Sequence, residues 1–238
     1  MKKILTAFIF ISLLLVSCGV SNKTVIRHQK MEEGVGSPTS VEELKEAIGK
    51  YQERVADTQL AMSQIGIWYK ILGTRYLDNK MYGPALEAFQ QALFYYPDNQ
   101  NLYYYVGVCA GYLSHASLDF DATGNQEKKY NYLKLAEESY LRAVNIDDRY
   151  TRALYALGVL YVFELDESEK AIPYLEKLLS IDTRHLDAMF VLARAYYMNY
   201  EFEKAIEMYD RVLANTKSDE RRIEAENNKK IILEASYN

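Results

Sequence analysis

Histidine and cysteine, which carry much of the catalysis and metal binding in proteins, are scarce in this chain of 238 residues. It has three histidines and two cysteines. His28, His115 and His185 lie far apart in the sequence, and none has a recognised metal-ligand or nucleophile motif beside it. Carboxylates are numerous, but on helices they mostly occupy solvated faces. The sequence therefore favours a binding protein over an enzyme, and it indicates no metal site and no cofactor.

The chain also lacks an excess of basic residues. Its formal net charge is −5 at pH 7, and residues of the two signs are evenly mixed along the sequence. Proteins that bind nucleic acid usually present a basic stripe. The composition therefore argues against a nucleic-acid partner.

The long apolar run near the N-terminus is too short to span a bilayer. It covers residues 4–16, and its 13 residues follow a short basic start. This length fits the apolar core of a signal peptide. The run ends in Leu-Val-Ser-Cys at residues 15–18, which resembles a bacterial lipobox. The resemblance implies that residues 1–17 are a lipoprotein signal peptide and that Cys18 carries lipid after cleavage.

Lipidation of Cys18 would place the protein on a membrane. Several acyl chains, at about 0.8 kcal/mol per buried CH₂, make such an anchor durable. Gly19 stands where some inner-membrane lipoproteins have aspartate, so the resemblance implies the outer membrane, facing the periplasm. The alternative is an ordinary signal peptide with an incidental cysteine. With Cys18 lipidated no intramolecular disulfide can form, and we expect Cys109 to be a buried structural residue.

Residues 18–39 are polar and weakly patterned, which predicts a lipidated flexible tether with a root-mean-square reach on the order of 25 Å. Folded structure is expected to begin at Ser40, which forms a capping box with Glu43. Apolar residues then recur at steps of three and four as far as Ile65. This pattern predicts an amphipathic N-terminal helix over residues 40–65. We expect that helix to cover the open face of the element that follows.

A repeat signature begins at residue 66. Eight residues match the spacing W-x₂-L-G-x₂-Y…A-x₃-F…P of a 34-residue pattern, with tyrosine for tryptophan at the first position. They are Tyr69, Leu72, Gly73, Tyr76, Ala85, Phe89, Ala92 and Pro97. The segment resembles a tetratricopeptide (TPR) repeat, which is a pair of antiparallel helices. Because such a repeat cannot bury its apolar face alone, the resemblance implies further copies.

Further copies follow, each with a small residue where the two helices cross. Gly107, Gly158 and Ala193 take the place of Gly73. The predicted units are TPR 1 at 66–99, TPR 2 at 100–150, TPR 3 at 151–185, TPR 4 at 186–219 and a C-terminal capping helix at 220–238. The capping helix is expected to turn Ile223, Ile231 and Ile232 inward. The resemblance implies an all-α fold, a TPR solenoid of antiparallel helix pairs in a right-handed superhelix with a capping helix at each end.

Two repeats are longer than the first. The third repeat has one extra residue between its helices. In the second repeat, Gly107 and Ala136 are 29 positions apart, whereas Gly73 and Ala85 of the first are 12 apart, so the second carries 17 extra residues. The insertion covers about residues 114–130. Its Asp119–Gly124 stretch matches the first half of a calcium loop, but Tyr130 stands where a bidentate glutamate is needed. A polar turn between lengthened helices, a calcium site and a partner-docking element all remain open.

TPR families line a concave groove with fixed positions of each first helix. Carried over to this sequence, those positions predict an aromatic and apolar groove with scattered positive groups. The candidate groove residues are Lys70, Tyr104, Tyr112, Arg152, Tyr155, Phe163, Phe190, Arg194 and Tyr197. Rigid aromatic side chains make strong anchors for peptides. The carboxylate clamp of chaperone-binding TPR domains is not assembled, because Thr74 and Tyr105 replace its asparagines.

Two functions remain open at this point. The first is a lipid-tethered scaffold that binds a protein or peptide of the bacterial envelope; in architecture it is similar to the TPR lipoproteins of outer-membrane β-barrel assembly and to type IV pilotins. The second is binding of a small ligand, as in the TPR lipoproteins of some tripartite solute transporters. An open groove favours the first, and a closed pocket favours the second. The pattern leaves the oligomeric state open.

Overall fold

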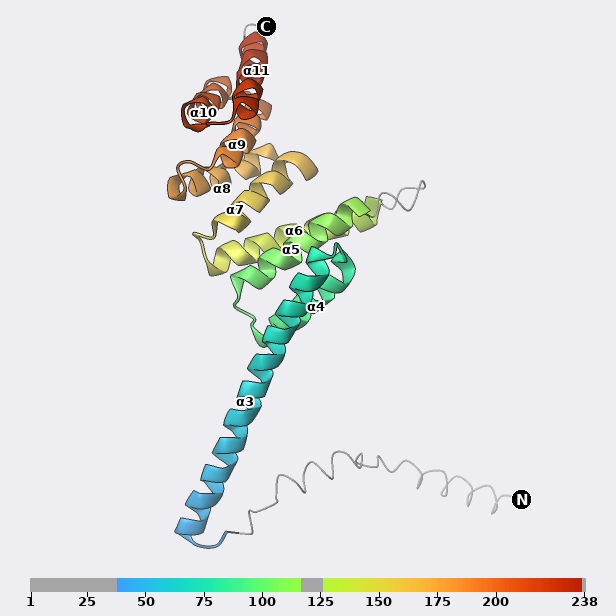
Figure 1. Cartoon of the computed structure of the whole chain (residues 1–238), viewed down its shortest axis with the longest axis vertical. Helices are drawn as coiled ribbons and strands as arrows, with labels where there is room; N and C mark the ends of the chain where they lie inside the picture. The colour runs from blue at the N-terminus through green and yellow to red at the C-terminus, as the bar shows by residue number, and fades with distance from the viewer. Residues whose placement is uncertain (1–37, 117–125, 237–238) are drawn as a thin grey trace, which may run out of the picture. The chain divides into compact units, whose positions relative to one another are not determined.

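The computed structural model describes residues 38–116 and 126–236, which form helices and no strand. The chain divides into a first unit that ends at Leu60 and a second that begins at Ala61. Helix α3 (Val41–Asp78) belongs to both units. The second unit continues with α4 (Tyr82–Tyr95), α5 (Gln100–Ala116), α6 (Gln126–Ile146), α7 (Thr151–Val159), the π-helical turn η1 (Leu160–Glu164), α8 (Ser168–Ile181), α9 (Leu186–Met198), α10 (Phe202–Asn215) and α11 (Asp219–Ser236) (Figure 1).

The predicted capping box starts α3. The backbone N–H of Glu43 donates to Oγ of Ser40 at 3.2 Å, and the N–H of Ser40 donates to Oε2 of Glu43 at 3.1 Å. Hydrogen bonds from the backbone N–H groups of Thr39 and Ser40 lower the pKa of Glu43. The two residues thus satisfy backbone donors that the first helical turn leaves free.

The prediction of a separate helix over residues 40–65 that covers the first repeat was wrong. Residues 41–78 form one helix with no break at the expected boundary. Gly66, the residue that could have broken it, is helical, and a Cβ there would lie 2.6 Å from the ring of Tyr96. Trp68 of the first repeat is 60% exposed.

The four predicted helix pairs are present in the second unit. They are the C-terminal part of α3 with α4, α5 with α6, α7 and η1 with α8, and α9 with α10 (Figure 1). Three pairs cross at a glycine against which the partner helix packs directly. A Cβ would lie 2.8 Å from Phe89 at Gly73, 2.4 Å from Tyr140 at Gly107, and 2.4 Å from Leu175 at Gly158. The fourth pair has the fully buried Ala193 at the same place.

The same turn joins the helices in the first, third and fourth repeats. A residue with positive φ occurs in each, namely Lys80 (59°), Asp166 (55°) and Tyr200 (61°). The next N–H donates to the carbonyl of the repeat's tyrosine, at 2.8 Å for Tyr76, 2.8 Å for Tyr161 and 2.9 Å for Tyr196. The third repeat keeps this turn despite its extra residue, because a π-helical turn absorbs one residue within a helix. The N–H of Leu165 there donates to the carbonyl of Leu160 at 3.1 Å.

The insertion lengthens the helices of the second repeat. Helix α5 runs to Ala116 and α6 begins at Gln126, which confirms the predicted lengthened second helix. Ala110 occupies the slot that holds a tyrosine in the other repeats. Leu133, at the position where the second helices of the other repeats begin, is buried in the same apolar cluster as Ala110. The candidate calcium stretch Asp119–Gly124 lies outside the described residues.

Helix α11 packs on the fourth repeat through Ala225 and Ile232, which are both buried. The prediction that Ile223 and Ile231 also face inward was wrong, since Ile223 is 56% exposed and Ile231 is 54% exposed. Residues seven apart share one face of a helix, so burial of Ala225 and Ile232 turns Ile223 away. Helix α11 therefore caps the array along a narrow face.

Candidate partner-binding site

A pocket of about 370 Å³ lies where α9 meets α11. We call it the α9–α11 pocket. Its lining residues are Phe190, Val191, Arg194 and Tyr197 from α9, Glu224, Asn228, Ile231 and Ile232 from α11, Phe163 from η1 and Tyr209 from α10. Four of the nine predicted groove residues, Phe163, Phe190, Arg194 and Tyr197, thus meet at one site.

The aromatic walls of the pocket are held by local packing. The ring of Phe190 meets Tyr209 edge-on, with centroids 5.8 Å apart. Phe163 lies on the π-helical turn and is 51% exposed, with the guanidinium of Arg194 5.3 Å from its ring centroid. The extra residue of the third repeat falls in that turn, beside Phe163. The pocket therefore has a fixed inner wall and a rim that is open to solvent.

Three polar groups complement these walls. Arg194 supplies a cation, Glu224 a carboxylate and Asn228 an amide. Burial raises the pKa of the Tyr209 hydroxyl, and Glu224 adds to the effect, whereas Arg194 and a hydrogen bond with Asn228 oppose it. Tyr209 thus stays neutral at physiological pH. An apolar cleft with a few polar groups suits a peptide ligand. The cleft can hold an apolar side chain of the peptide, and the polar groups can bond to its neighbouring peptide groups.

Helix α11 was expected only to cap the array, and its contribution to the pocket was not predicted. Glu224, Asn228 and Ile231 each follow a pocket residue of α9 by 34 residues, the length of one repeat. The ion pair between Arg221 and Asp187, at 2.7 Å, joins the same two helices at the same offset. Helix α11 therefore takes the place of the first helix of a further repeat. Extending the groove positions by one more repeat length would have found these residues.

Tyr104 and Arg152 form a separate group on the second and third repeats, and Tyr155 contacts His185 at the start of α9. The guanidinium of Arg152 lies 4.3 Å from the ring centroid of Tyr104 and 5.4 Å from that of Tyr105. Burial raises the pKa of Tyr155, whose ring lies 5.2 Å from that of His185. Such cation–π contacts contribute about 0.5–1 kcal/mol at exposed sites. In this group the positive charge already has aromatic partners within the protein.

Tyr112 and Lys70 join neither group. The ring of Tyr112 stacks on Tyr82 of α4, with centroids 4.3 Å apart and planes 10° from parallel. It therefore packs between the first and second repeats. Lys70 is exposed on α3, and its carbonyl accepts a hydrogen bond from the Thr74 hydroxyl at 3.0 Å. Thr74, which replaces an asparagine of the carboxylate clamp, thus bonds to its own helix.

The structure describes only one of the two cysteines. Cys18 lies outside the described residues. Cys109 is fully buried, as expected, and burial raises the pKa of its thiol to about 12. No group of three or more His, Cys, Asp or Glu residues within 38–116 and 126–236 is placed to hold a metal ion. Over the same ranges, no helix combines the length and the apolar character that crossing a bilayer requires.

Comparison with known sequences gives two matches. The family model described as Tetratricopeptide repeat matches residues 162–225, from η1 in the third repeat into α11. A TPR repeat-containing protein of Borreliella burgdorferi is 28% identical over 225 residues, which cover 92% of this chain and 95% of that protein. The similarity thus extends over nearly the whole length of both chains.

Solved structures of the same fold include TPR proteins from several sources. The MamA protein matches with a TM-score of 0.60 and 22% identity, over 73% of this chain and 83% of its own. YrrB, described as a TPR protein with an unusual peptide-binding site, matches with a TM-score of 0.54 and 22% identity, over 79% of this chain and 85% of its own. Over the described residues the chain is an all-helical, TPR-like array of helix pairs, and residues 162–225 match the tetratricopeptide repeat model.

Proposed function

We propose that this protein is a membrane-tethered scaffold that binds a peptide segment of another envelope protein, with one apolar side chain of the segment seated in the α9–α11 pocket. The observation that carries the proposal is the convergence of four aromatic residues with a cation, a carboxylate and an amide in that pocket. Buried aromatic anchors surrounded by polar groups are the usual centres of binding energy in protein interfaces.

The openness of the rim favours a peptide over a small molecule. Phe163 and Ile231 are each about half exposed, so the pocket does not enclose its occupant. A peptide can leave one side chain in the pocket while its backbone continues along the groove. The description of YrrB as a TPR protein with a peptide-binding site shows that this fold is compatible with such a ligand.

The rim residues provide the test. A photo-crosslinking amino acid at Phe163 should capture a partner in the native envelope, and one at Phe94, an exposed aromatic outside the pocket, should not. A Phe163→Ser and Ile231→Ser double variant should then lose that partner while it keeps its helical content. Phe94→Ser serves as the matched control. Equal capture from the two positions would contradict the proposal.

The membrane tether depends on the lipobox resemblance at residues 15–18. Cys18→Ala should move the protein from the membrane fraction to the soluble fraction of lysed cells. The Cys109→Ala variant, which removes the buried thiol, should stay on the membrane. Separation of the two membranes on a density gradient should place the wild-type protein with the outer membrane. Tight membrane association of Cys18→Ala would exclude lipidation as the anchor.

The second candidate function is binding of a small ligand for a solute transporter. The volume of the α9–α11 pocket, about 370 Å³, favours it, since small-molecule sites measure roughly 300–1,000 Å³. Native mass spectrometry of protein purified without denaturation distinguishes the two functions. A bound small molecule that is lost in the Phe163→Ser and Ile231→Ser variant would replace the peptide proposal.

A further inference from the structure

One face of α3 carries a heptad pattern within the first unit. Apolar or small residues recur there at alternating steps of three and four, at Val41, Leu44, Ile48, Tyr51, Val55 and Thr58. We call these six residues the α3 seam. In heptad letters Val41, Ile48 and Val55 take position a, and the other three take position d. The register continues in the sequence at Met62 and Ile65, which gives about three and a half heptads.

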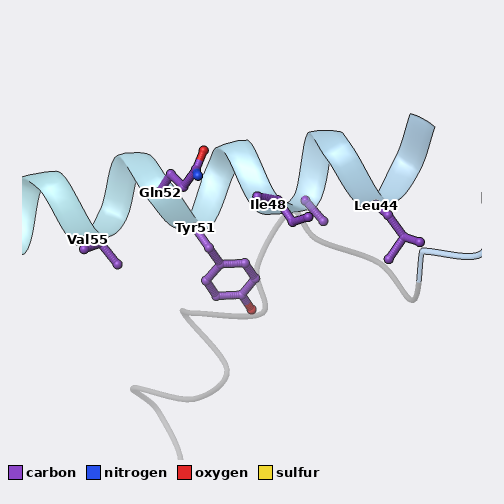
Figure 2. Close-up of a pocket in the computed structure, with 6 residues that line it drawn as sticks. Leu44, Ile48, Tyr51, Gln52 and Val55 are labelled. Atoms are coloured by element: carbon purple, nitrogen blue, oxygen red, sulfur yellow. The ribbon is translucent and has the colours of Figure 1, made fainter. Parts of the chain in front are cut away.

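The seam is exposed. Its five large apolar residues, from Val41 to Val55, are between 38% and 60% exposed. Figure 2 shows the side chains of Leu44, Tyr51 and Val55 on one side of the helix. A continuous exposed apolar row of this kind marks an interaction surface.

The shape of the seam fits another helix. A hollow of about 390 Å³ runs along it, lined by Leu44, Ala47, Ile48, Tyr51, Gln52 and Val55 (Figure 2). All six hold heptad positions a, d, e or g. In a two-stranded coiled coil each a or d side chain inserts between four residues of the facing helix. The hollow therefore lies where a second helix would place its side chains.

The charges of α3 are sorted around the seam. Every acidic residue of this part of the helix takes an outer position b, c or f, namely Glu42, Glu43, Glu46, Glu53 and Asp57. Glu46 pairs with Lys50 on that outer face, at 2.8 Å. Helices that lie on anionic membranes usually have a basic polar face. The acidic outer face of α3 argues against a lipid surface as the occupant of the seam.

We propose that the α3 seam binds a second copy of this chain in a parallel, two-stranded coiled coil. In parallel coiled coils, valine or isoleucine at position a with leucine at d favours two strands, and the α3 seam has a β-branched residue at all three a positions and leucine at its first d position. In that arrangement Arg54 at position g faces Gln59 of the other copy at position e, so identical helices meet without charge repulsion. A two-fold interface of this kind uses the same surface on both copies. The proposal goes beyond the scaffold function, which needs only one chain.

Sedimentation of the full chain in detergent at micromolar concentration tests the pairing. The wild type should have the mass of two chains, and the double variant Ile48→Glu with Val55→Glu should have the mass of one. The change should weaken pairing at least tenfold, because it places like charges at buried positions. Glu46→Gln with Glu53→Gln, on the outer face, should still pair. Circular dichroism should show the same helical content in all three proteins.

Disulfide formation tests the orientation. Two a positions face each other only in a parallel pair, so Val55→Cys should crosslink on oxidation and Glu53→Cys should not. Wild-type chain gives the background, since its Cys109 is buried. A wild-type mass of one chain, pairing that survives the double glutamate variant, or preferential crosslinking through Glu53→Cys would each overturn the proposal. Binding of single chains to anionic vesicles that is lost in the double glutamate variant would assign the seam to a membrane instead.

Discussion

Replacement of Gly107 by alanine should destabilise the protein, although alanine is the better helix former. Gly107 lies in α5, where its helix crosses α6. A Cβ at this position would lie 2.4, 2.6 and 2.8 Å from three ring atoms of Tyr140. Tyr140 is buried, and its ring lies next to that of Tyr104, with centroids 5.9 Å apart. The ring therefore has little room to move aside.

The magnitude follows from two opposing effects. Alanine in place of glycine stabilises a helix interior by about 1 kcal/mol. Overpacking a well-packed core costs about 1–3 kcal/mol, and three clashing ring atoms in a buried aromatic residue place Gly107→Ala near the upper end of that range. The net loss in the free energy of unfolding should be about 2 kcal/mol. Gly111, one turn later in the same helix, has nothing within 4 Å of a Cβ, so Gly111→Ala should gain about 1 kcal/mol.

Urea unfolding of the two variants, followed by circular dichroism, measures both effects. We expect the midpoint to fall for Gly107→Ala and to rise for Gly111→Ala. In thermal melting, the midpoint temperature should shift by about 2–4 °C for each kcal/mol of change in stability in a domain of this size. If Gly107→Ala were as stable as Gly111→Ala, the inference that α6 packs directly on Gly107 would be refuted.

Two further predictions concern single contacts. The hydroxyl of Tyr196 donates to Glu176 at 2.5 Å, so Tyr196→Phe should cost about 1 kcal/mol at neutral pH. Burial and Glu176 raise the pKa of Tyr196; the unfolded chain therefore loses this proton first, and stability should fall above about pH 10. Melting curves against pH should show a smaller alkaline loss for Tyr196→Phe than for the wild type. Leu133→Ala, beside Ala110, should cost about 2–5 kcal/mol in urea unfolding, whereas the exposed Tyr130→Ala should change little.

The helix pairs could be predicted from the sequence because their packing rules are local. A small residue at the crossing point recurs at a fixed offset, with a tyrosine three residues later in every repeat but the second, and the structure places Gly73, Gly107 and Gly158 against their partner helices as expected. Even the extra residue of the third repeat was visible as a change in spacing. The π-helical turn that accommodates this residue could not be predicted, because the spacing between motif residues does not show which backbone hydrogen bonds shift.

The continuity of α3 could not be predicted from its apolar pattern. A helix that ends at Ile65 and folds back has the same steps of three and four as one that continues to Asp78. The difference would lie in a turn signal, and Gly66 was the one residue there that could have provided it. In the structure Gly66 serves close packing against Tyr96, whose hydroxyl donates to the carbonyl of Ser63 at 2.9 Å. Gly66 therefore permits close packing against α3 and does not interrupt that helix.

Repeat position alone also limited the prediction of the candidate groove. Position in the repeat identifies which side chains can face the groove, but it does not say which of them are already occupied. Arg152 contacts Tyr104 and Tyr105, and Tyr112 stacks on Tyr82, whereas Arg194 contacts Phe163, which is half exposed at the rim of the pocket. Whether a ring contacts a neighbour or a partner depends on residues far away in the sequence.

The two roles of α11 decide how the site can be tested. Ala225 and Ile232 of this helix close the apolar core, and Glu224, Asn228 and Ile231 line the pocket. Deletion of the chain after residue 218 would remove both, so loss of a partner in such a truncation would report on folding as much as on binding. Ile231→Ser changes a rim residue that is more than half exposed. That variant, and not the deletion, separates recognition from stability.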